Sequence, residues 1–85
     1  MPTAEVINTL SGPQVVEYMT WLGQNEGLDR NRLLVRGVSN LANRLARLGV
    51  DNVGVHLDCT KHFLRLVLHE GVRPMQAVNR VVQYL

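Results

Sequence analysis

Four side chains that could bind a metal or act as nucleophiles fall close together in the second half of the sequence. They are His56, Cys59, His62 and His69. Cys59 and His62 are three residues apart and would share one face of a helix. A closed zinc site needs four ligands at recognisable spacing, and the second Cys or His pair of the known patterns is missing. We therefore expect no metal and no cofactor, and we interpret these residues as surface histidines beside a small buried thiol.

Motifs for catalysis are missing from the 85 residues. There is no nucleophile motif of the Gly-x-Ser-x-Gly type, no phosphate-binding glycine loop and no zinc-protease motif. Most of the seven carboxylates fall where helix caps or helix surfaces are expected. A chain of this length also has little room for a substrate pocket beside its core. We expect a protein that is not an enzyme.

A second set of polar side chains, rich in arginine, follows a helical period. Spacings of four, three, one and three place the set on one side of a helix, opposite a leucine stripe. Its members are Arg36, Asn40, Asn43, Arg44 and Arg47. Arginine pairs well with phosphate, and asparagine can pair with a base edge. The set predicts a nucleic-acid interface; the alternatives are a solvated face or one that pairs with an acidic first helix.

The charge is divided along the chain, although the net charge is only +2. Residues 1–29 carry four acids and no base, residues 30–50 carry five arginines and no acid, and residues 51–85 carry a net charge of +1. In the acidic segment Tyr18 and Trp21 could stack on bases. They share helical spacing with apolar neighbours, which favours packing in a core or a dimer.

Helical periods dominate the first fifty residues. Ser11 and Gln14 form a capping box, which predicts a helix ending at a glycine near residue 23 or 27. Asp29 is the expected cap of a second helix, which a leucine stripe carries to a stop at Gly49. The stripe consists of Leu34, Val38, Leu41, Leu45 and Leu48. Gly37 lies inside this helix, where glycine costs about 1 kcal/mol relative to alanine, so the alternative to one continuous helix is a break there with Ser39 capping a second piece.

Beyond residue 50 the period changes. Val53, Val55 and Leu57 alternate with small or polar residues, which predicts a short strand at 53–57. Asp58 would then cap a helix that Gly71 closes, and Pro74 would begin a last helix. The sequence therefore predicts one mainly helical, all-α domain over residues 1–85. It would have four to five helices, and the strand would pair in a dimer.

Length and composition indicate an oligomeric state and a cellular compartment. A domain this small buries a modest core, so we expect a homodimer. Cys59 is the only cysteine, which fits a reducing compartment. The first residues lack the features of a signal peptide, and no apolar run is long enough to span a bilayer. We expect a cytoplasmic protein without a membrane partner.

Residues 52–85 resemble a ribbon-helix-helix repressor unit. That resemblance implies a strand at 53–57 that pairs with a second chain in the DNA major groove, with Asn52 and His56 facing the bases. Residues 63–82 also resemble a helix-turn-helix. This second resemblance implies that DNA is contacted by Arg73, Gln76, Asn79 and Arg80.

The function expected from the sequence is that of a small dimeric DNA-binding regulator, or a plasmid or phage accessory protein. The alternative is a non-enzymatic protein–protein interaction module in which an acidic helix and an Arg-rich helix pair between chains or with a protein partner. RNA is a third possible partner, because a basic patch attracts any polyanion. The expected nucleic-acid-binding residues are Arg32, Arg36, Asn40, Arg44, Arg47, Asn52, His56, Arg73 and Arg80.

Overall fold

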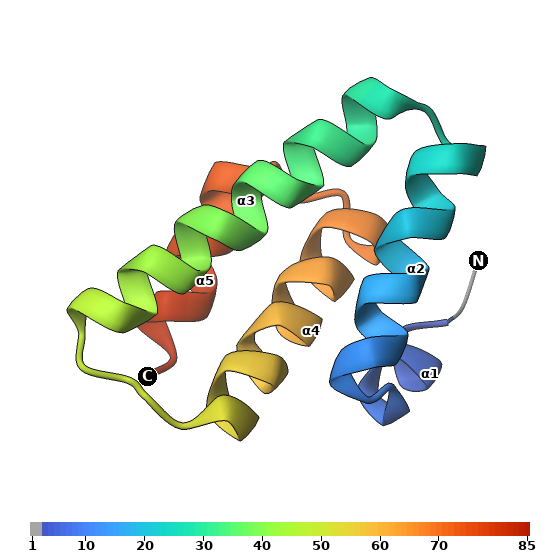
Figure 1. Ribbon diagram of the computed structural model, residues 1–85. Helices are drawn as coiled ribbons and strands as arrows, with labels where there is room; N and C mark the ends of the chain where they lie inside the picture. The colour runs from blue at the N-terminus through green and yellow to red at the C-terminus, as the bar shows by residue number, and fades with distance from the viewer. Residues whose placement is uncertain (1–2) are drawn as a thin grey trace.

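Five helices follow one another along the chain in the computed structural model (Figure 1). The structure describes residues 3–85, with every side chain in that range except that of Leu28. The helices are α1 (Ala4–Thr9), α2 (Gly12–Asn25), α3 (Leu28–Arg47), α4 (Val53–His69) and α5 (Pro74–Gln83). No strand occurs among residues 3–85, so the all-α prediction is confirmed. Within the same range, no helix combines the length and the apolar character needed to cross a bilayer.

The first two helices begin at hydroxyl caps. The backbone N–H of Ser11 donates to Oε1 of Gln14 at 2.8 Å, and the N–H of Gln14 donates to Oγ of Ser11 at 3.4 Å. This is the predicted capping box of α2. Thr3 caps α1 by accepting from the N–H of Val6. Helix α1 could not be predicted from the sequence, because six residues are too few to show a helical period.

The start of α3 differs from the prediction, and its end agrees with it. Gly27, with φ of 102°, is the N-cap, so the expected Asp29 cap is wrong and that carboxylate lies in the first turn instead. At the other end Gly49 has φ of 80°, a backbone conformation that favours glycine. The N–H groups of Gly49 and Val50 donate to the carbonyls of Ala46 and Leu45, which completes the predicted stop.

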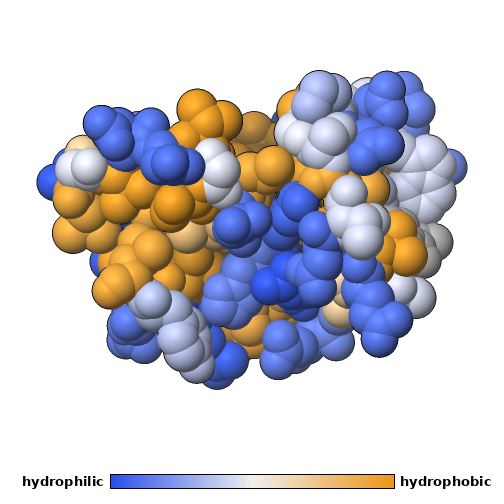
Figure 2. Space-filling view, turned by 90° about the horizontal axis from the view of Figure 1, so that it is seen from below, coloured by the Kyte–Doolittle hydropathy of each residue, from blue (hydrophilic) through white to orange (hydrophobic). Residues whose placement is uncertain are grey.

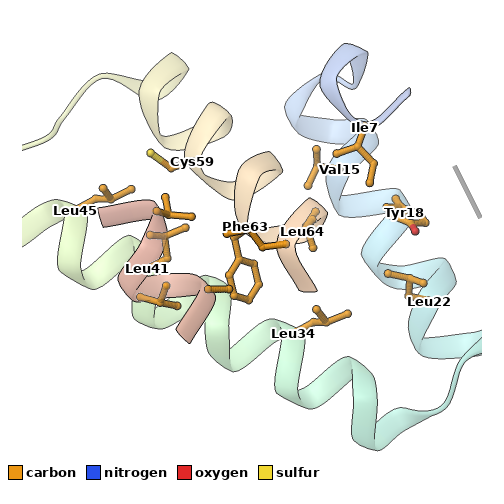
Figure 3. Close-up of a cluster of buried hydrophobic side chains, with 14 residues drawn as sticks. Ile7, Val15, Tyr18, Leu22, Leu34, Leu41, Leu45, Cys59, Phe63 and Leu64 are labelled. Atoms are coloured by element: carbon orange, nitrogen blue, oxygen red, sulfur yellow. The ribbon is translucent and has the colours of Figure 1, made fainter. Parts of the chain in front are cut away.

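Of the two alternatives at Gly37, the structure has the continuous helix, because α3 runs through this residue without interruption. Gly37 is buried and faces the ring of Phe63 from α4. A Cβ at position 37 would lie 2.3 Å from Cζ of Phe63, so the glycine provides the space that the ring occupies. Figure 3 shows Phe63 pointing from α4 toward α3, in a cluster to which α3 contributes leucines. Leu34, Leu41 and Leu45 are fully buried there, as the stripe predicts, whereas Leu48 at the C-cap is exposed.

Residues 53–57 are helical, so the predicted strand is absent from the single chain. Asn52 is the N-cap of α4, and its Oδ1 accepts from the N–H of Val55 at 3.1 Å. The predicted cap, Asp58, lies well inside the helix. Three alternating apolar residues are too few to fix a period of two, and the cap overrides them. A ribbon shared by two chains would require these first turns of α4 to unwind.

Removal of this cap tests the start of α4. Asn52→Ala is expected to lower the free energy of unfolding by about 1 kcal/mol, because the N–H of Val55 loses its acceptor. Asn52→Asp keeps an acceptor and should retain wild-type stability. Urea denaturation followed by circular dichroism measures both variants. Equal stability of Asn52→Ala and the wild type would contradict the helical start.

The central helices are α3 and α4. Helix α3 packs against α2, α4 and α5, and α1 packs against α4. Nζ of Lys61 donates to the carbonyl of Asn8 at 3.0 Å, and Arg65 donates to the side chain of the same residue.

Figure 2 shows hydrophobic surface toward the end of the molecule where α3 ends and α4 begins. Exposed apolar side chains of that end belong to Leu48, Val53, Tyr84 and Leu85.

Candidate nucleic-acid interface

Helices α3 and α5 lie side by side and run in the same direction (Figure 1). Nδ2 of Asn40 lies 3.5 Å from the sulfur of Met75, and the guanidinium of Arg44 donates to Oδ1 of Asn79. From the first contact to the second, the residue number rises by four on α3 and by four on α5. This is the pattern expected of two helices that run parallel. The polar side of α3 therefore continues onto α5.

We call this joint surface the basic face. It is formed by Arg36, Asn40, Arg44 and Arg47 of α3, with Asn79 and Arg80 of α5. Arg36 and Arg47 are exposed on α3, one turn from the junction, and Arg80 is exposed on α5. Arg44 is half-buried, because its guanidinium reaches across to α5. The face thus presents separate guanidinium groups, of which Arg44 is held by a neighbouring helix.

The packing brings together the two segments of the chain that contain no acid. Residues 30–50 carry five arginines, and residues 71–85 carry Arg73 and Arg80. Together these segments have a charge of +7. The rest of the chain carries Lys61 and Arg65 against all seven acids, a charge of −5. A net charge of only +2 therefore conceals a positive pair of helices.

The arginines of the basic face are not neutralised by the acidic helices. Among residues 3–85 the one ion pair joins Arg32 and Asp29 at 4.0 Å, and both side chains are well exposed. An exposed pair of this kind contributes little to stability. The basic face is therefore free to meet an external anion, which is what a polyanion site requires and what an internal acid–base pairing of helices would not show.

The remaining predicted site residues occupy other positions. Arg32 lies one turn before Arg36 on α3, and Arg73 is exposed at the N-cap of α5. Asn52 is used as the cap of α4. Nε2 of His56 lies 2.7 Å from the carbonyl of Val50, in a partly buried contact that ties α4 to the preceding loop. The structure therefore groups the arginines and leaves Asn52 and His56 in local contacts.

The cysteine and histidines of α4 do not converge. No group of three or more His, Cys, Asp or Glu side chains is arranged to hold a metal in the part of the chain that the structure describes. Burial raises the pKa of the Cys59 thiol, and Asp58 adds to that shift. Burial lowers the pKa of His62, and Arg65 lowers it further. Both shifts favour the neutral forms, which suits side chains packed beside α5.

Sequence reasoning found the arginines of α3 but not the surface that they form. It placed Asn79 and Arg80 in a separate helix-turn-helix interpretation, although Arg44 contacts Asn79 across 35 residues of sequence. No local signal reports such a contact, because the period of each helix gives its buried side and not its neighbour.

Comparison with known proteins gives no family: no family model, no curated protein and no solved structure matches the chain.

Proposed function

We propose that the protein binds duplex DNA through the basic face, as a small regulator or accessory factor. One observation carries the proposal: the two acid-free segments of the chain form neighbouring helices, joined by Arg44 and Asn79. Phosphate is the group best matched to several exposed guanidinium forks on one surface. The one ion pair among residues 3–85, between Arg32 and Asp29, involves no residue of the basic face.

In this proposal phosphate contacts provide most of the affinity. Arg36 and Arg47 project from α3 and would lie along one strand of the backbone, with Arg80 reaching toward it from α5. Asn40 and Asn79 border the junction and would supply hydrogen bonds to phosphate or to a base edge. The residues of the ribbon hypothesis, Asn52 and His56, take no part.

Self-association is the second part of the proposal. Leu48, Val53, Tyr84 and Leu85 leave apolar surface exposed at one end of the molecule. Exposed apolar patches are common at protein interfaces. This surface supports the expected homodimer, which would present two basic faces.

The salt dependence of DNA affinity tests the proposal. Each phosphate neutralised by an arginine releases condensed counterions, so log K falls with log salt concentration by about 0.9 per contact. Three contacts on each chain predict a slope of about −3 for a monomer and about −5 for a dimer. Fluorescence anisotropy with a random-sequence duplex at several salt concentrations gives the slope, and sedimentation without DNA gives the number of chains.

Two results would count against the proposal. Absence of binding to any duplex at ~50 mM salt and micromolar protein would remove it, because counterion release is strongest at low salt. A slope near zero would show that the arginines do not reach the phosphates. Tighter binding to single-stranded or duplex RNA of equal length would move the proposal from DNA to RNA.

A further inference from the structure

A shallow groove of about 510 Å³ lies along one side of α2 and includes Leu10, the residue at the C-cap of α1. Its lining residues are Leu10, Gln14, Glu17, Tyr18 and Trp21. The rings of Tyr18 and Trp21 are stacked, with centroids 6.1 Å apart and planes 20° from parallel. Trp21 is 40% exposed, so part of the indole is available to an occupant.

This groove is separate from the basic face. On α2 the side that meets α3 carries Met19 and Gly23, where Asn31 donates to the carbonyl of Met19 at 2.8 Å. Gln14 and Trp21 lie on the other side of the same helix. An occupant of the groove would therefore not compete with DNA for the arginines of α3.

One charged side chain borders the groove. The carboxylate of Glu17 borders the groove, in a segment from residue 3 to residue 29 that holds four acids and no base. The groove therefore offers a negative charge and an aromatic face.

We propose that the groove binds an arginine-bearing amphipathic segment of another polypeptide. The guanidinium would stack on the exposed indole of Trp21 and donate to the carboxylate of Glu17. An apolar side chain of the same segment would pack on Leu10. Charge complementarity selects this occupant, because an acidic segment with no base repels an acidic partner and attracts a basic one.

Trp21 is the only tryptophan, so its fluorescence reports occupancy of the groove directly. The probe is a blocked hexapeptide, acetyl-Ala-Arg-Leu-Leu-Arg-Ala-amide, titrated into the full chain. A saturable change in Trp21 emission is expected. The analogue with lysine in place of arginine should bind about threefold more weakly, because the ammonium stacks less well than the guanidinium on the indole.

Two variants with the same net charge locate the binding site. Glu17→Gln should weaken the arginine peptide about fourfold, the effect of losing one exposed ion pair. Glu5→Gln removes an acid from α1 that does not line the groove, and it should leave the affinity unchanged. Circular dichroism confirms that both variants keep the helical content of the wild type.

Three outcomes would overturn the inference. The first is an unchanged Trp21 emission at millimolar peptide. The second is an equal loss of affinity in Glu5→Gln and Glu17→Gln, which would mean general charge attraction without a site. The third is concentration-dependent self-association of the protein that Glu17→Gln abolishes, since a second copy would then be the occupant. None of these measurements contains DNA, so their failure is distinct from failure of the proposed function.

Discussion

Replacing Gly37 by alanine is expected to lower the free energy of unfolding by about 2 kcal/mol, although alanine is the better helix former. The added Cβ would lie 2.3 Å from Cζ of Phe63, and the two cannot share that space. Overpacking of a filled core costs about 1–3 kcal/mol, and so short a distance places this case at the upper end; subtracting the gain of about 1 kcal/mol in helix propensity leaves about 2 kcal/mol. Urea denaturation of the two proteins measures the difference.

A second background shows whether Phe63 is the cause. In a Phe63→Leu protein the shorter side chain leaves room at position 37, so Gly37→Ala should be neutral or stabilising by up to about 1 kcal/mol. The two substitutions would then differ from additivity by about 2–3 kcal/mol. Additive effects would mean that Gly37 and Phe63 are not in contact, and the packing of α3 on α4 would need another explanation.

The double variant Arg36→Gln/Arg47→Gln is expected to weaken DNA binding by at least tenfold at ~100 mM salt. Both side chains are exposed on α3, so their removal should leave the fold intact. Loss of two phosphate contacts should also reduce the salt slope by about 2 for each chain. Anisotropy titrations at several salt concentrations give both quantities.

A variant of equal net charge separates contact from general attraction. Gln14→Glu/Gln24→Glu adds two negative charges at exposed positions of α2 that do not border α3. It should lower the affinity less than the arginine variant and leave the slope nearly unchanged. Equal effects of the two variants would show that DNA responds to the total charge alone. Arg44 is a poorer choice for this test, because its bond to Asn79 links α3 to α5 and its loss would change packing as well.

The parts of the fold that follow from local chemistry could be predicted from the sequence. The capping box of Ser11 and Gln14 and the glycine stop at residue 49 depend on neighbouring residues, and both are present. The stripe of Leu34, Leu41 and Leu45 follows from the helical period. At residues 53–57 the alternation predicts a strand, but a period of two over five residues is weaker than the helix cap that Asn52 supplies.

The features that could not be predicted depend on contacts between distant segments. From the sequence alone, Gly37 indicates a weak helix interior. The structure shows that the ring of Phe63 fills the space beside it. The arginines of α3 could be identified from their spacing, but their continuation onto α5 requires the packing of the two helices.

The attachment of α1 has a consequence for local motion. This six-residue helix buries one side chain, Ile7, and is held to α4 by Lys61 and Arg65 through Asn8 alone. Because so few contacts hold α1, we expect its local opening to require less free energy than the opening of α3 or α4. Its amide hydrogens would exchange with solvent long before those of the central helices. Because Leu10 follows directly, each such opening would also take away one wall beside Trp21.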